Sequence, residues 1–435
     1  MNTGIYRRRR ERLAAAMGAG VAIVPTAPER TRNRDSHYPY RFDSYFYYLT
    51  GFREPEAALV IIAGAQARHV LFCRDKDPER ENWDGFRYGP EAARESFGFD
   101  ETHSIHQIDA LMPDLIADRG ALYYRLGEDS SWDARITGWI NQVRDRARSG
   151  VTAPGEIKDP HALLDEMRLI KGPEELAVMR RAAAITTGAH RRAMRLAQPG
   201  RAEYELEAEL LHEFRRQGAQ APAYSPIVAA GDRACVLHYV QNDGRLEDGD
   251  LLLIDAGCEL DGYAADVTRT FPVNGKFSGP QREVYELVLA AQTAAIAAAR
   301  PGNGWEAPHH AAVEILAQGL IDLKLLAGGV AEALETESYK KYYMHRTGHW
   351  LGLDVHDAGD YKRGGEWRKL APGMVLTVEP GCYIRAGDGV PERFAGIGVR
   401  IEDDVAITDT GAEVLTRDAP KHPAEIEAWM GSRDA

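Results

Sequence analysis

The chain has 435 residues and a formal net charge of −13, from 53 Lys and Arg against 66 Asp and Glu. At roughly 150 residues per domain, this length predicts two or three domains. Hydrophobic residues make up 44% and charged residues 27%, which is typical of globular proteins and excludes collagen-like, disordered and coiled-coil classes. The acidic balance argues against nucleic-acid binding, and no run approaches the roughly 18 apolar residues of a membrane span. Four cysteines form no disulfide framework and predict a reducing, cytoplasmic compartment.

The N-terminal segment over residues 7–24 combines a basic start with a weakly apolar stretch, as a signal peptide does. Glycines interrupt that stretch, and no small-residue cleavage site closes it. We therefore expect a short basic helix, a glycine turn and a strand over 21–24. Two further apolar runs, at 57–62 and 69–73, are predicted to be strands because turn residues flank them.

The Gly172-Pro173 pair is typical of a helix start and predicts the domain boundary. Residues 1–171 alternate short strands and helices, which predicts an α/β domain. Residues 172–435 contain strand clusters separated by helices, including two alanine-rich helices near 279–299 and 305–322. This second part is expected to be an α+β domain.

Carboxylates at the ends of apolar strands give the strongest chemical signal. Asp255 closes an apolar strand, and Asp266 follows a turn at 260–262. Whichever pair of residues that turn centres on, the two aspartates share one face, either directly opposed or as diagonal neighbours. Like charges in this arrangement repel, so the pair needs a shared proton or a bound cation. The alternative is that one aspartate faces solvent or pairs with Arg269.

Two further carboxylates repeat this pattern. Glu379 ends an apolar strand, and Glu402 lies in a second apolar strand predicted over 397–405, where Arg400, Glu402 and Asp404 share one face. A structural salt bridge between Arg400 and Glu402 is the alternative explanation for the second acid. It leaves the other acids unexplained.

Histidines accompany the acids. His345, His349 and His356 fall within twelve residues of a glycine-punctuated apolar stretch, and His238 lies earlier. The spacing of His345 and His349 is that of a zincin helix, but Arg346 occupies the position of the required glutamate. Four carboxylates with imidazole and no thiolate suit two divalent cations of the Mn²⁺, Co²⁺ or Mg²⁺ type, which activate a bridging water. The residues alone therefore predict metal-assisted hydrolysis.

A family resemblance rests on six segments of the second domain: 237–239, 254–258, 262–277, 348–357, 377–381 and 399–404. They resemble the pita-bread metallopeptidases and, within that family, the aminopeptidase P group, the Xaa-Pro aminopeptidases. The order Asp, Asp, His, Glu, Glu is highly specific. The resemblance continues through 35–41 and 46–56, so it covers nearly the whole chain.

The resemblance implies a C-terminal pita-bread catalytic domain preceded by a smaller N-terminal α/β domain. It also implies that the enzyme releases the N-terminal residue from peptides with proline in the second position, by means of a metal-bridging hydroxide. Two ions, usually Mn²⁺, would be bound by five side chains: Asp255, Asp266, His349, Glu379 and Glu402. Glu379 would also shuttle protons.

The resemblance assigns the remaining candidates as well. His345, His356 and His238 would stabilise the oxyanion and line the pocket, and Arg400 would hold the bridging Glu402. The implied substrate contacts are Asp35, Trp83 and Tyr383. The first two would come from a neighbouring subunit of a homo-oligomer, a tetramer or dimer.

One departure separates the chain from the bacterial pattern: Arg346-Thr347-Gly348 stands where that pattern reads Gly-Leu-Ser. The departure removes no ligand. The nearest alternative function is that of a prolidase, which shares the ligand set and cleaves only Xaa-Pro dipeptides. A non-catalytic binding protein of the same fold would be expected to have lost ligands, and this chain has lost none.

Overall fold

The computed structural model describes residues 3–387 and 389–432. Contacts divide the chain into two units, Met1–Met167 and Arg168–Ala435. The division falls before the Gly172-Pro173 pair, which begins a long helix as expected. Within the described residues, none of the helices has the length and apolarity needed to cross a membrane.

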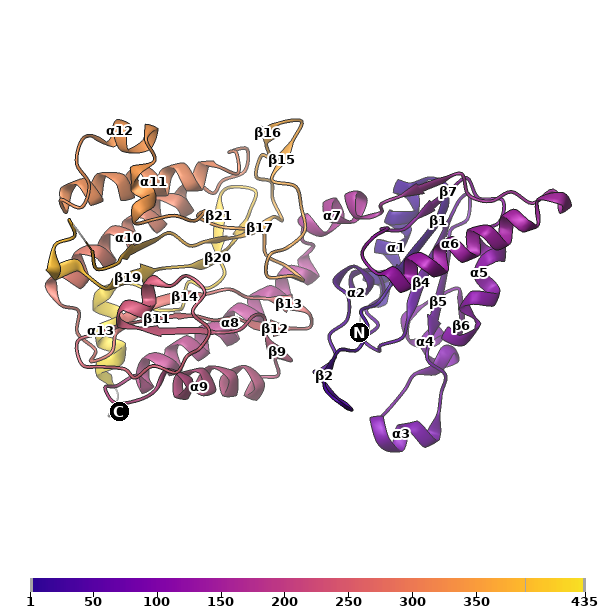
Figure 1. Cartoon of the computed structure of the whole chain (residues 1–435), viewed down its shortest axis with the longest axis horizontal. Helices are drawn as coiled ribbons and strands as arrows, with labels where there is room; N and C mark the ends of the chain where they lie inside the picture. Colours follow the sequence, from indigo (N-terminus) through magenta and orange to yellow (C-terminus); the bar gives the residue numbers. More distant parts are fainter. Residues whose placement is uncertain (1–2, 388, 433–435) are drawn as a thin grey trace. The chain divides into compact units, whose positions relative to one another are not determined.

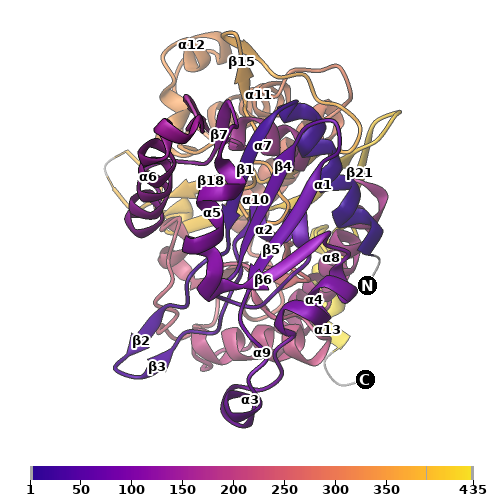
Figure 2. The same ribbon diagram turned by 90° about the vertical axis from the view of Figure 1, so that its right-hand side faces the viewer.

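A mixed sheet forms the centre of the first unit (Figures 1 and 2). Its strands are β1 Gly20–Pro25, β4 Ala58–Ala63, β5 Arg68–Cys73, β6 Glu101–Ser104, β7 Ala121–Tyr123 and β8 Glu156–Lys158. They lie in the order β6-β5-β4-β1-β7-β8, with β4 antiparallel to both of its neighbours and the other pairs parallel. Buried residues along β1 and β4 explain their unbroken apolar sequences.

Helices and a small hairpin complete the first unit. The helices are α1 Thr3–Met17, α2 Ser44–Thr50, α3 Pro78–Asp84, α4 Gly89–Phe97, α5 Ile108–Ile116, α6 Ser130–Asp145 and α7 His161–Leu169, which ends in the second unit. An exposed hairpin pairs β2 Thr31–Asn33 with β3 Ser36–His37. The predicted N-terminal helix, glycine turn and strand are confirmed as α1 and β1, and the two predicted strands as β4 and β5.

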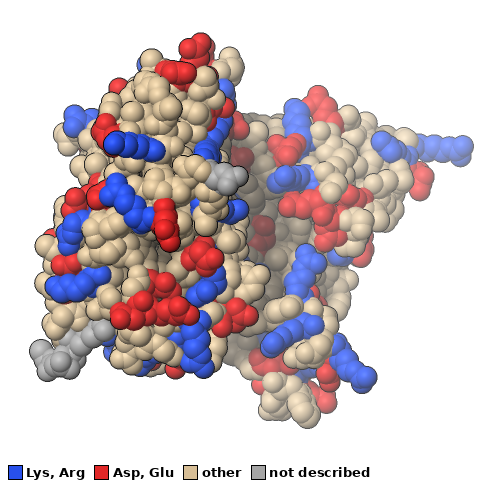
Figure 3. All heavy atoms as spheres, turned by 60° about the vertical axis from the view of Figure 1, so that its left-hand side comes forward, with Lys and Arg blue, Asp and Glu red and all other residues tan. Residues whose placement is uncertain are grey.

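Long helices cover the small sheets of the second unit. The helices are α8 Pro173–Leu196, α9 Glu203–Arg216, α10 Gly279–Ala298, α11 Ala307–Asp322, α12 Val330–Glu335 and α13 Pro423–Gly431. The two predicted alanine-rich helices are thus confirmed as α10 and α11. Acidic and basic side chains intermingle on the face of this unit drawn in Figure 3, and no continuous basic surface appears on that face.

The strands of the second unit form five small sheets within the described residues. The strands are β9 Ala221–Pro222, β10 Ile227–Ala230, β11 Leu251–Asp255, β12 Cys258–Leu260, β13 Tyr263–Ala264, β14 Thr268–Pro272, β15 Lys362–Arg363, β16 Glu366–Trp367, β17 Val375–Val378, β18 Gly381–Ile384, β19 Ile397–Arg400, β20 Asp403–Ile407 and β21 Ala412–Val414. Two of these sheets, β10-β11-β14 and β17-β20-β21, place the acidic residues.

The hairpin that follows β11 adopts the diagonal register. Leu260 pairs with Tyr263 across the turn, and Asp255 pairs with Thr268 rather than with Asp266. Asp266 therefore lies two residues along the strand from the position opposite Asp255, on the same face. The direct opposition that the sequence also allowed is not observed.

The expectation of one strand over 397–405 is wrong. β19 ends at Arg400 and pairs with β18, whereas β20 begins at Asp403 and pairs with β17. Between them, the Glu402 amide donates a hydrogen bond to the Thr268 carbonyl oxygen (3.0 Å). The break therefore places Glu402 where the second sheet meets the end of β14.

A fully buried arginine on β14 joins the same two sheets. The Arg269 guanidinium donates to an Asp403 carboxylate oxygen (2.7 Å) and to the Glu402 carbonyl oxygen (2.5 Å). Lys421 also donates to Asp403 (2.6 Å). The alternative that Arg269 pairs with Asp255 or Asp266 is wrong. Arg269 follows the residue opposite Asp255, so its side chain leaves the other face of the strand.

We predict that Arg269→Met lowers the free energy of unfolding of the second unit by about 3–5 kcal/mol, because it breaks a buried ion pair. Urea denaturation measures this change. The matched control is Arg180→Met, which removes an exposed ion pair with Glu413 (2.7 Å) and should change the same quantity by less than about 1 kcal/mol. Equal losses in the two variants would contradict the role assigned to Arg269.

Candidate metal centre

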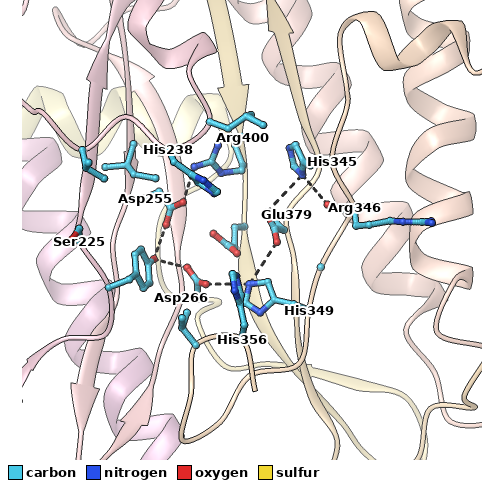
Figure 4. Close-up of a pocket in the computed structure, with 17 residues that line it drawn as sticks. Ser225, His238, Asp255, Asp266, His345, Arg346, His349, His356, Glu379 and Arg400 are labelled. Atoms are coloured by element: carbon cyan, nitrogen blue, oxygen red, sulfur yellow. Dashed lines mark hydrogen bonds and ion pairs between the residues drawn. The ribbon is translucent and has the colours of Figure 1, made fainter. Parts of the chain in front are cut away.

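A cavity of about 460 Å³ opens in the second unit where the acidic strand ends converge (Figure 4). The sequence-predicted residues that line it are Asp255, Asp266, Glu379, Glu402, His238, His345, His349, His356 and Arg400. These residues are separated by up to 164 positions in the sequence, from His238 to Glu402, so the fold assembles the site. Asp35 and Trp83 belong to the first unit, where both are exposed.

Three side chains meet at the centre of the cavity. Asp266, His349 and Glu402 each offer one ligand atom, and these atoms lie within 4.8 Å of one another. His349 Nε2 is 3.4 Å from an Asp266 oxygen and 3.7 Å from a Glu379 oxygen. The structure therefore brings the histidine and three of the four predicted acidic ligands together directly, and Asp255 is linked to Asp266 through a shared partner.

Close backbone packing fixes His349. Its amide donates to Thr377 Oγ1 (3.1 Å), and a Cβ added at Gly348 would lie 2.0 Å from the Thr377 carbonyl oxygen. The segment is irregular rather than helical, which excludes the zincin arrangement. His349 Nδ1 lies 3.0 Å from the Trp350 carbonyl oxygen, which can only accept. Nδ1 therefore carries a proton, and Nε2 faces the acids.

Tyr224 is a site residue that the sequence analysis missed. Its hydroxyl lies 2.6 Å from an Asp255 oxygen and also hydrogen-bonds an Asp266 oxygen. A phenol has one proton to donate, so it cannot satisfy two carboxylates at once as a donor. Tyr224 lies in an irregular segment before β10, and no spacing or motif in the sequence marks it.

Arg400 contacts a different acid from the one expected. Its guanidinium donates to Asp255 (2.6 Å), to Thr268 Oγ1 (3.1 Å) and to the Tyr383 hydroxyl (3.0 Å). Glu402 instead accepts a hydrogen bond from Thr268 Oγ1 (2.6 Å). The predicted Arg400–Glu402 contact is therefore wrong as a direct pair. It is replaced by a link through Thr268, because the backbone turns between β19 and β20.

Tyr383 lies behind the cavity wall rather than in it. The side chain is 1% exposed, and its hydroxyl lies 2.8 Å from His345 Nε2. His345 Nδ1 lies 2.7 Å from the Arg346 carbonyl oxygen, so His345 is held at both ring nitrogens. The expected substrate contact of Tyr383 is corrected to a contact with His345 and Arg400. Burial, followed by the charge of Arg400, lowers the pKa of His345 to about 4.

The other two predicted histidines are more exposed. His356 packs edge-to-face on His349 with ring centroids 4.3 Å apart, and burial together with the charge of His349 lowers the pKa of His356. His238 lines the cavity from the loop before β11. Both imidazoles therefore face the space in which a substrate would lie.

The electrostatics of the acids fit divalent cations. Burial and mutual repulsion raise the pKa of Asp266 and of Glu402, and burial raises the pKa of Glu379 to about 7. Although burial opposes it, the hydrogen bond to Asp266 raises the pKa of His349 to about 9. Without ions the buried acids therefore hold protons that they would release on binding cations, and two divalent ions would balance four carboxylates. Carboxylate oxygens with imidazole and no thiolate suit Mn²⁺ or Mg²⁺.

Comparison with known proteins places this site in a family. The sequence model of metallopeptidase family M24 matches residues 177–409, and that of the aminopeptidase P N-terminal domain matches residues 6–123. The chain belongs to metallopeptidase family M24. It is 46% identical over 428 residues to the Xaa-Pro aminopeptidase of Escherichia coli, covering 98% of this chain and 97% of the relative. It is also 46% identical over 427 residues to the Xaa-Pro aminopeptidase of Haemophilus influenzae, covering 98% of this chain and 96% of that relative.

Solved structures agree with this membership. Aminopeptidase PepP of Pseudomonas aeruginosa matches with a TM-score of 0.98 at 51% identity, covering 100% of this chain and 99% of that chain. A variant of E. coli aminopeptidase P in complex with substrate matches with a TM-score of 0.97 at 45% identity and the same coverage. The predicted pita-bread domain behind an N-terminal α/β domain is confirmed, as is the resemblance to Xaa-Pro aminopeptidases. As a member of family M24, the chain is a metallopeptidase and therefore a hydrolase.

We predict that Tyr224→Phe weakens Mn²⁺ binding about tenfold, because groups that orient metal ligands change affinity 10–100-fold when removed. Isothermal titration calorimetry on the metal-stripped protein measures this affinity. Tyr263→Phe is the matched control, since its hydroxyl donates to Glu175 (2.8 Å) rather than to a candidate ligand. An unchanged affinity in Tyr224→Phe would show that this hydroxyl does not organise the ligands.

Proposed function

We propose that the chain releases the N-terminal residue from peptides with proline in the second position. The observation that carries this proposal is the convergence of the candidate ligands in one cavity of a chain 46% identical to Xaa-Pro aminopeptidases over nearly its whole length. The proposed ligands of two ions, with Mn²⁺ as the native metal, are Asp255, Asp266, His349, Glu379 and Glu402.

The residues around the ions have distinct proposed roles. Divalent ions, when bound, polarise a peptide carbonyl and lower the pKa of water. Glu379 accepts and returns the proton, since its carboxylate lines the cavity 3.7 Å from His349. His356, His345 and His238 contact the substrate from the cavity wall. Arg400 orients Asp255 by direct contact (2.6 Å).

We also propose a homotetramer in which Asp35 and Trp83 of a neighbouring subunit cap the cavity. Asp35 lies in the turn of the exposed β2–β3 hairpin. Trp83 is 82% exposed at the end of α3, and Phe86 beside it is 65% exposed, so another copy has apolar surface to cover.

We also propose a cellular compartment and limits for the two domains. All four cysteines are free and buried, which supports a reducing, cytoplasmic compartment. We retain 1–171 and 172–435 as the limits of the functional domains.

Hydrolysis of Arg-Pro-Pro and Ala-Pro, each with and without added Mn²⁺, tests the function. We expect Mn²⁺-dependent release of arginine from the tripeptide, faster than cleavage of the dipeptide, and loss of activity on chelation. Activity confined to Ala-Pro would identify a prolidase instead. Full activity in metal-free protein would exclude the two-ion mechanism.

We predict that Glu379→Gln lowers kcat by about 10²–10⁴-fold, because the amide cannot take up a proton. Steady-state kinetics measure the loss, and circular dichroism verifies that the fold is kept. Glu413→Gln, at an exposed ion pair with Arg180, serves as the control with unchanged kcat. Near-normal turnover of Glu379→Gln would remove Glu379 from the proton-transfer step.

A further inference from the structure

Two arginines line the cavity, and the metal centre uses only one of them. Arg400 is buried and committed to Asp255, Thr268 and Tyr383. Arg346 is exposed, and within the described part of the chain no carboxylate lies in ion-pair range of its guanidinium. Its positive charge is therefore not neutralised by an acidic side chain of the described residues.

The structure fixes the backbone of Arg346 and supports its side chain. The Arg346 carbonyl oxygen lies 2.7 Å from His345 Nδ1, which ties the residue to a histidine of the cavity wall. The guanidinium carbon lies 5.8 Å from the centroid of the Trp367 ring on β16, at the outer limit of a cation–π contact. Arg346 also lines an adjoining recess with Trp305, His309 and Trp367.

The cavity is electrostatically polar. Figure 4 shows Ser225 and Asp255 on one side of the acidic cluster and Arg346 on the other, with its side chain extending away from the cluster. A short peptide has the same polarity, with an ammonium group at one end and a carboxylate at the other. The four acids attract the ammonium end, and Arg346 offers a positive group beyond them.

Resting on the proposed function, we propose that Arg346 is a specificity-determining residue that binds the C-terminal carboxylate of short peptide substrates. An aminopeptidase holds one residue on the N-terminal side of the scissile bond, so the rest of the peptide extends away from the acids. A guanidinium matches a carboxylate with two parallel hydrogen bonds. The glycine that the bacterial pattern places at this position has no side chain for such a contact.

The test compares Arg-Pro-Pro as the free acid with the same peptide as its C-terminal amide. The two peptides differ only in the charge that Arg346 would bind. With Mn²⁺, we expect the wild-type enzyme to favour the acid about 2–5-fold in kcat/KM, the size expected of an exposed charged contact. Added salt should reduce this preference, because it screens exposed charges.

Variants separate charge recognition from loop structure. Arg346→Ala should bring the acid-to-amide ratio of kcat/KM close to one, mainly by lowering kcat/KM for the acid. Arg346→Lys should retain part of the preference for the acid. Arg363→Ala, on the neighbouring β15 and outside the cavity lining, should leave the ratio at the wild-type value.

Each contrary outcome has a distinct meaning. Carboxylate recognition by Arg346 would be overturned if Arg346→Ala lowered kcat/KM equally for both peptides. It would also be overturned if this variant kept the wild-type ratio of kcat/KM between acid and amide. Equal rates on acid and amide in the wild type would do the same and leave the proposed function intact. A wild-type enzyme that cleaves neither peptide would overturn the proposed function and this role with it.

Discussion

Repulsion among four carboxylates in one cavity is the constraint on which the second unit depends. Asp266 and Glu402 are 5% and 2% exposed, so water does little to screen them. The fold supplies a buried guanidinium to Asp255 and a second one, from Arg269, to Asp403 just behind Glu402. These cations hold the periphery of the cluster, whereas burial and mutual repulsion raise the pKa of Asp266 and Glu402 at its centre. The centre is therefore preorganised for divalent ions, which can take the place of the protons that these acids otherwise hold.

The fold accommodates the repulsion among the carboxylates by placing the acidic residues at strand ends. At such ends the backbone is no longer committed to a ladder, so side chains from several sheets can converge on one point. Two features of the backbone bring these strand ends together. A Cβ at Gly257, just after Asp255, would lie 1.7 Å from the Ala265 carbonyl oxygen, so only glycine allows this approach. The break between β19 and β20 brings Glu402 onto the end of β14.

Local periodicity explains which parts of the site the sequence could predict. The shared face of Asp255 and Asp266 follows from their even spacing across a turn, and it holds in either register. The partner of Arg400 does not follow from its own strand, because the guanidinium reaches Asp255 on a different sheet. Tyr224 is likewise placed by tertiary packing from a segment without periodicity. Long-range strand pairing decides these contacts, and no local pattern encodes it.

The site separates rigid groups from exposed ones. The candidate acidic ligands accept hydrogen bonds from buried partners such as Thr268 and Thr377, so a substitution among those partners is expected to disturb ion binding. His238, His356 and Arg346 instead lie exposed on loops at the cavity wall, where a changed side chain alters contacts with the substrate and leaves the buried hydrogen bonds intact. A chain of this fold can therefore keep its ligands while its rim diverges. The departure at Arg346 follows this division, since it changes the charge of the rim and removes no ligand.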